Sequence, residues 1–289
     1  MLFLALALLF NVLVSAVLKL FPKYEINALQ AIVVNYGTCV LTGWGFTGAT
    51  PLTLSSLHAP WFLWSVLLGV SFIIIFTLTA YCTKVDGMTT TIMASKLSLI
   101  IPVICSVILY KESLGLIKVA GILLAFPAVY LSTRSGSEEK AAKSLLWPAL
   151  LFVLSGGLDT LVNFVQTRFL SIPADQAAGT IMIFAIAGLT GIILLGVLSA
   201  TGKVQFAVKN AIAGLALGIP NFFSIYFLVK GLNSGVFQSS ATIPLFNISV
   251  LVFTSLVAIV LFKERTNKLQ IMGLLLATGA ILLIALGDK

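Results

Sequence analysis

Long uninterrupted apolar runs constrain the fold of this sequence more than any other feature. A helix that crosses the hydrocarbon core of a bilayer needs about 20 mostly apolar residues. Ten segments meet that requirement: 2–20, 28–47, 60–82, 88–109, 114–133, 145–168, 176–199, 208–231, 236–262 and 267–286. The runs are too long for strands and lack the apolar–polar alternation of membrane β-barrels. We therefore expect an all-α integral membrane protein with ten transmembrane helices.

Composition leads to the same expectation. Of the 289 residues, 60% are hydrophobic and 9% are charged, whereas soluble domains carry about 25% charged residues. The apolar excess must face lipid, so the bilayer is an expected partner and the predicted location is the cell (inner) membrane, multi-pass. The first run lacks the basic start and the cleavage site of a signal peptide, and it predicts a retained helix.

The net charge of +8 does not predict nucleic-acid binding, because the basic residues stand singly in short loops and form no patch. They indicate topology instead. Odd-numbered loops hold eleven Lys or Arg and even-numbered loops with the termini hold five, which predicts both termini outside. With one histidine, His58, and three scattered cysteines, neither a metal site nor a disulfide framework nor any cofactor is expected.

The sequence divides into two similar halves. Residues 1–134 form the first predicted five-helix repeat, 135–144 a polar linker, and 145–289 the second repeat. Two short motifs carry the similarity: Leu109-Tyr110-Lys111-Glu112 precedes Gly121, and Leu261-Phe262-Lys263-Glu264 precedes Gly273, with an offset of 152 between copies. Five helices per repeat make the second copy enter the membrane from the opposite side. Such inverted repeats underlie alternating access in many transporters.

These motifs, with Pro102 ten residues before Glu112, give a pattern that resembles the drug/metabolite transporter superfamily and its ten-helix EamA-type branch. The resemblance covers about 1–133 and 145–286, although Thr254 stands where the second copy would carry the proline. It implies a permease for small solutes such as amino acids, sugars, nucleosides or their phosphates. It also implies cytoplasmic termini, which conflicts with the count of loop charges.

Asp159 lies near the middle of its segment, fourteen residues from Leu145, or about 20 Å along a helix. With Ser155, Asn163 and Gln166 it forms one polar stripe, which must face protein or a water-filled cavity because lipid leaves polar groups unsatisfied. Intramembrane carboxylates usually bind substrate, cation or proton. A structural hydrogen bond to a neighbouring helix is the alternative.

Lys96 lies eight residues into its segment, about 12 Å from the start. It would bind an anionic solute group or pair with Asp159; alternatively its long stem reaches the interface. Polar residues on other segments are weaker candidates, since hydrogen bonds between helices explain them equally well. The predicted substrate-binding residues are Asp159, Lys96, Asn163, Asn11, Asn221, Asn247 and Ser95.

The favoured hypothesis is a secondary transporter for a small-molecule solute, coupled to a proton or to solute exchange. No nucleotide-binding loop of the P-loop type is present. We do not expect an enzyme, because the segments carry no paired carboxylates and no convergent catalytic set. A lipid carrier, or a receptor or scaffold that transports nothing, remains the alternative because fold does not determine function.

Overall fold

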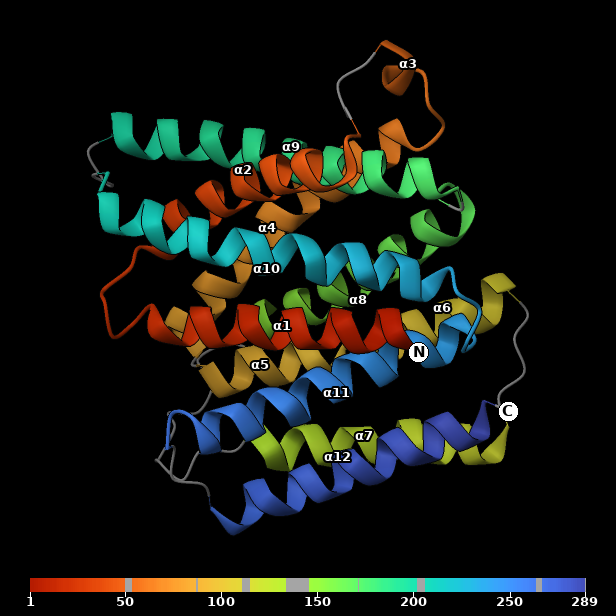
Figure 1. Cartoon of the computed structure of the whole chain (residues 1–289). Helices are drawn as coiled ribbons and strands as arrows, with labels where there is room; N and C mark the ends of the chain where they lie inside the picture. Colours follow the sequence, from red (N-terminus) through yellow and green to blue (C-terminus); the bar gives the residue numbers. More distant parts are fainter. Residues whose placement is uncertain are drawn as a thin grey trace. The chain divides into compact units, whose positions relative to one another are not determined.

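The structure is a computed structural model that describes residues 1–49, 54–86, 88–110, 115–133, 146–170, 172–201, 206–263 and 267–288. Within these ranges the chain is helical and contains no strand (Figure 1). The predicted linker, 135–144, lies outside them, as do Lys111, Glu112 and Glu264 of the repeated motifs.

The described helices follow the predicted segments to within a few residues. In the first half they are α1 (Leu2–Leu20), α2 (Ala28–Thr47), α3 (Leu54–Leu57), α4 (Phe62–Asp86), α5 (Met88–Leu97), α6 (Ile100–Tyr110) and α7 (Leu116–Thr133). In the second half they are α8 (Leu146–Arg168), α9 (Pro173–Ala200), α10 (Val208–Leu232), α11 (Ser239–Val260) and α12 (Lys268–Gly287). Two features differ from expectation: α3 is a short extra turn, and the predicted segment 88–109 is broken into α5 and α6.

Eight helical segments among the described residues are long and apolar enough to cross a membrane. The shorter α7 is also apolar, whereas α2 carries several buried polar side chains. Large apolar side chains are strongly exposed along the helices, as at Leu63 and Leu116, which suits contact with lipid tails. The chain is therefore an all-helical, multi-pass membrane protein, and the total of ten spans stays a prediction.

The first compact unit comprises Met1–Ile74 and Phe164–Ser234. Within it, α10 packs against α1 and α2, and α2 packs against α9 (Figure 1). Aromatic rings pack between these helices, for example Phe10 of α1 and Phe46 of α2, which both contact the ring of Phe223 on α10. Apolar packing therefore holds this unit together around the polar side chains described below.

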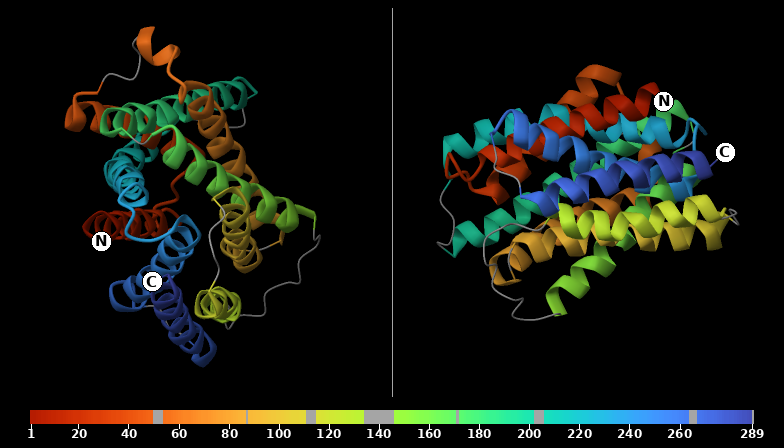
Figure 2. Two further views of the ribbon diagram at one scale, coloured as in Figure 1. Left: turned by 90° about the vertical axis from the view of Figure 1, so that its right-hand side faces the viewer. Right: turned by 90° about the horizontal axis from the view of Figure 1, so that it is seen from below.

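The second compact unit comprises Ile75–Asn163 and Gly235–Lys289. Its apolar core is formed by α6, α7, α11 and α12 and includes Val103, Ile122 and Ile248. The helices α7 and α12 lie side by side along their length (Figures 1 and 2). Each compact unit thus contains helices from both sequence halves. The boundaries of the two units therefore differ from those of the two predicted repeats.

Glycines set the closest helix contacts in both units. A Cβ at Gly121 of α7 would lie 2.8 Å from Cγ1 of Ile284, and one at Gly273 of α12 would lie 2.8 Å from the carbonyl carbon of Leu131. In the first unit, a Cβ at Gly43 of α2 would lie 2.6 Å from Cγ1 of Ile181 on α9. These distances leave no room for a larger side chain, so the packing requires glycine, whose side chain is a single hydrogen atom, at each of these positions.

The α2–α9 pair has a second such contact, because a Cβ at Gly191 of α9 would lie 2.6 Å from Cγ2 of Val33. In this pair, as in α7–α12, the contacted residue numbers rise along one helix while they fall along the other. Both pairs are therefore antiparallel.

Candidate substrate site

A break between two helices positions Lys96. This residue lies in the last turn of α5, and α6 begins only at Ile100. Pro102 accounts for the break, because a proline lacks the N–H and clashes with the carbonyl four residues earlier, here that of Ser98. The Ser98 carbonyl instead accepts a hydrogen bond from the amide of Ile101 at 2.9 Å. Lys96 is thus held at the end of a half-helix within an apolar segment.

Asp159 reaches this break from α8 because the two backbones approach closely. A Cβ at Gly156 would lie 2.7 Å from the carbonyl oxygen of Ser98 and 2.5 Å from Cδ1 of Ile101. Asp159 follows three residues later, on the same side of α8. Asp159 and Lys96 lie near each other, while the described residues contain no direct salt bridge between them.

Asn247 of α11 adds an amide to the same place. Its Nδ2 donates a long hydrogen bond of 3.5 Å to Oδ2 of Asp159. It lies three residues after Pro244, which interrupts the backbone ladder inside α11. The site therefore combines a carboxylate, an ammonium and an amide from three helices of one unit.

Asn163 and Ser95 lie in the same unit with different surroundings. Asn163 is buried and donates from Nδ2 to Oγ of Ser106 at 3.2 Å, which joins α8 to α6. Ser95 is half-buried beside Lys96, and its carbonyl accepts from Oγ of Ser98 at 2.6 Å. The predicted polar stripe of α8 faces protein as expected, since Ser155, Asn163 and Gln166 are all buried.

Lys96 and Asp159 are each half-buried as whole residues, and both lie within apolar helical segments. Hydrocarbon cannot solvate a charge or accept its hydrogen bonds. The ammonium of Lys96 and the carboxylate of Asp159 therefore each require a polar partner, which water or a polar ligand could supply. This arrangement differs from a closed structural ion pair, in which the two charges satisfy each other.

Asn11 and Asn221 lie in the first unit, so the predicted site residues form two sets. Asn11 of α1 donates from Nδ2 to Oγ of Ser224 at 3.1 Å. Asn221 of α10 donates from Nδ2 to Oδ1 of Asn35 at 3.1 Å, close to Pro220. These amides join helices, as the alternative interpretation expected.

Sequence reasoning missed Asn35, which is buried on α2 and also lies 3.8 Å from Sγ of Cys39. The sequence signal that could have identified Asn35 is its amide side chain within the apolar segment 28–47.

A buried ion pair was also missed. Lys118 is one of the five basic residues that the charge count above assigned to even-numbered loops and the termini. It is instead fully buried in the first turn of α7, and its Nζ lies 2.6 Å from Oδ1 of Asp288. The same Nζ donates to Oε1 of Gln238 at 3.0 Å, and the amide of Gln238 donates to Oδ2 of Asp288 at 2.7 Å. This network joins the ends of three helices, and no local pattern in the sequence pairs residues so far apart.

Groups of three or more His, Cys, Asp or Glu side chains that could hold a metal ion do not occur in the part of the chain that the structure describes.

Comparisons with known proteins agree with a fold shared over the whole length. An uncharacterized protein from Haemophilus influenzae is 27% identical over 293 residues, covering 98% of this chain and 97% of its own. A protein of known crystal structure superposes with a TM-score of 0.76 at 15% identity, covering 98% of each chain. That likeness extends to the fold alone. No protein-family model matches this sequence.

Proposed function

We propose that the chain is a secondary transporter, a permease of the cell (inner) membrane that moves a small metabolite by alternating access. The observation that carries this proposal is the position of Lys96 and Asp159, two half-buried opposite charges at the break between α5 and α6. Broken membrane helices that meet polar side chains near the bilayer centre are typical of transporter binding sites.

The charges suit a solute that carries both signs. Since no direct salt bridge joins the two groups among the described residues, each can take a partner of its own. Asp159 would bind an amine or a coupling proton, and Lys96 would bind an anionic group. The amide of Asn247, already directed at the carboxylate, would orient the bound group.

The glycine contacts are compatible with the inverted repeat that many alternating-access transporters contain. Gly121 and Gly273 are equivalent at the offset of 152 residues, and so are Ser132 and Ile284. Gly121 packs on Ile284, and Gly273 packs on Ser132. Each helix of the antiparallel pair thus contacts the other through equivalent positions, as a two-fold axis across the helices would produce.

The α2–α9 pair repeats this pattern at an offset of 148 residues. Gly43 packs on Ile181 and Gly191 packs on Val33, so a glycine and a β-branched residue exchange places. Equal offsets follow from the antiparallel packing itself, because residue numbers run in opposite directions along the two helices. The glycines at both contact points of each pair are compatible with a duplicated, inverted architecture. They fit the same expectation as the resemblance to the ten-helix EamA-type permeases.

Exchange in proteoliposomes tests this function. Vesicles loaded with unlabelled solute would be assayed for uptake of labelled amino acids, sugars, nucleosides and nucleoside phosphates. Asp159→Asn and Lys96→Gln should each lower exchange of the accepted solute about tenfold or more, because a lost charged hydrogen bond costs about 1.5–3 kcal/mol. Glu25→Gln and Lys84→Gln change exposed charges elsewhere and should leave exchange unchanged.

Two outcomes would contradict the proposal. Folded protein that exchanges none of these solutes would favour a receptor or scaffold role. Exchange indifferent to Asp159→Asn would show that the carboxylate binds nothing that moves. A charge swap, Lys96→Asp with Asp159→Lys, should restore part of the exchange lost in the single variants if the two charges act as a pair.

A further inference from the structure

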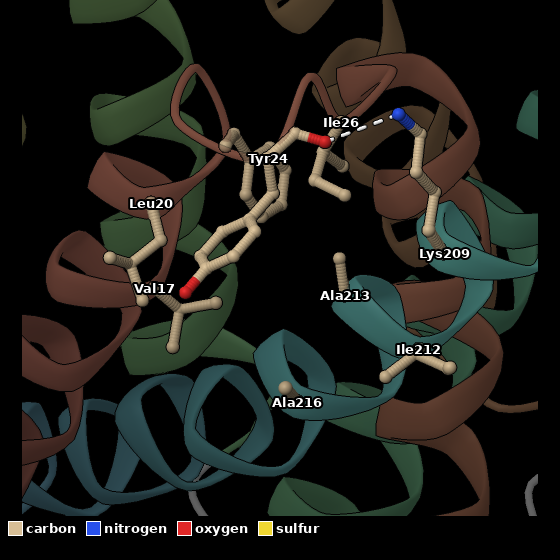
Figure 3. Close-up of a pocket in the computed structure, with 9 residues that line it drawn as sticks. Val17, Leu20, Tyr24, Ile26, Lys209, Ile212, Ala213 and Ala216 are labelled. Atoms are coloured by element: carbon tan, nitrogen blue, oxygen red, sulfur yellow. Dashed lines mark hydrogen bonds between the residues drawn. The ribbon is translucent and has the colours of Figure 1, made fainter.

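An apolar pocket of about 310 Å³ opens at one end of the first unit and shares no residue with the Lys96–Asp159 site. It lies between the end of α1, the turn after it and the start of α10 (Figure 3). Val17, Leu20 and Phe21 line it from one side, and Ile212, Ala213 and Ala216 from the other. Its volume is near the lower end of about 300–1,000 Å³ for small-molecule sites, which suits a single hydrocarbon chain.

The turn after α1 shapes this pocket. The amide of Ile26 donates to the carbonyl of Phe21 at 2.9 Å and that of Glu25 to the carbonyl of Pro22 at 3.2 Å, with Glu25 at φ 50°. These bonds and the left-handed residue form a Schellman motif, which commonly brings together its first and last apolar side chains. Here those side chains are Phe21 and Ile26, and both line the pocket.

Basic side chains surround the rim. Nζ of Lys209 lies 3.2 Å from the carbonyl oxygen of Tyr24 (Figure 3), and Nζ of Lys23 lies 5.6 Å from the centroid of the Tyr24 ring, which itself lines the pocket. The nearby acid is Glu25, 3.8 Å from Lys209, and these two side chains are 88% and 52% exposed. A pair this exposed contributes little, so Lys209 remains available to a stronger anion.

The pocket lies where headgroups would meet these charges. Leu4 and Asn11 of α1 contact Gly231 and Ser224 of α10, so the two helices are antiparallel, and the end of α1 meets the start of α10. Ends of membrane-spanning helices lie at the interface, where lysines attract anionic lipids. The apolar walls then lie at the depth of the acyl chains.

We propose that this pocket holds one acyl chain of an anionic phospholipid, whose phosphate is bound at the rim by Lys209 and Lys23. The apolar walls select a hydrocarbon chain, and the two ammonium groups select a negative headgroup over a zwitterionic one. This site is independent of transport, because none of its residues belongs to the proposed solute site.

Native mass spectrometry of the full chain in a neutral detergent tests the site, with phosphatidylglycerol and phosphatidylcholine titrated separately. Phosphatidylglycerol should bind more tightly. Lys209→Gln should weaken its binding about fivefold, which corresponds to about 1 kcal/mol for one basic residue, and should leave phosphatidylcholine unchanged. Glu25→Gln should tighten phosphatidylglycerol binding, because it removes the competing carboxylate. Lys84→Gln, an exposed lysine at the end of α4, is the control.

A second pair of variants tests the chain-binding part. Ala216→Phe fills the pocket from an exposed position and should weaken both lipids, whereas Ala149→Phe, an exposed alanine of α8, should weaken neither. Equal affinity for the two lipids in the unaltered protein would overturn the proposal. So would equal effects of Lys209→Gln and Lys84→Gln, or a dimer whose formation displaces the lipid, which would assign the pocket to a second copy of the chain.

Discussion

The neighbouring residues Gly156 and Gly157 on α8 give the sharpest test of the packing that positions Asp159. A Cβ at Gly156 would lie 2.7 Å from the carbonyl oxygen of Ser98, whereas a Cβ at Gly157 would have no atom within 4 Å. The two alanine variants therefore add the same methyl group one residue apart, once into the break between α5 and α6 and once into open space.

The two substitutions should change the free energy of unfolding by different amounts and in opposite directions. Overpacking costs typically about 1–3 kcal/mol, and the neighbour at Gly156 includes backbone, which yields less easily than the end of a flexible side chain. Gly157→Ala gains helix propensity of at most about 1 kcal/mol, and less where the unfolded chain stays helical in the membrane. We expect Gly156→Ala to lower stability by about 1–3 kcal/mol and Gly157→Ala to change it by less than 1 kcal/mol.

The assay is unfolding of the purified protein by sodium dodecyl sulfate in mixed micelles, followed by circular dichroism, with solute exchange measured in parallel. Gly156→Ala should also lower exchange, because moving α8 separates Asp159 from Lys96. Equal stability and equal exchange in the two variants would refute the close approach of α8 to the break, and with it the geometry of the site.

Three further predictions concern stability. Asp288→Asn should destabilise the protein by about 3–5 kcal/mol, because it leaves the buried Lys118 charge without its partner; the double variant with Lys118→Met should recover most of this in the same unfolding assay. Glu25→Gly should raise the thermal midpoint by relieving a left-handed residue, worth roughly 1 kcal/mol, while Glu25→Gln should not. Ser224→Ala should cost about 0.6 kcal/mol and at most about 1.7 kcal/mol, as expected for one hydrogen bond between membrane helices; a double-mutant cycle with Asn11→Ala measures it.

The positions of the helices could be predicted from the sequence because the bilayer imposes one length and one polarity on every span. Asp159 and Lys96 could be singled out for the same reason, since charges within apolar runs are costly and rarely incidental. The function of both residues stays a prediction until transport is measured.

The remaining features depended on contacts between distant residues. The break at Ser98 was not expected, although Pro102 was noted, because a proline in the first turn of a helix and one within a kinked helix look alike in sequence. The pairing of Lys118 with Asp288 spans 170 residues. Asn35 acquired significance only through its contact with Asn221.

Hydrophobicity along the chain therefore determined that this protein is helical, lies in a membrane and carries a few isolated charges within it, since those properties follow from local transfer free energies. Only the tertiary structure determined which polar groups contact each other. It also determined that α8 approaches the α5–α6 break at Gly156, and that Lys118 is buried rather than in a loop. Contacts of that kind depend on side-chain shape and on helices that are distant in sequence, so they cannot be predicted from local hydrophobicity.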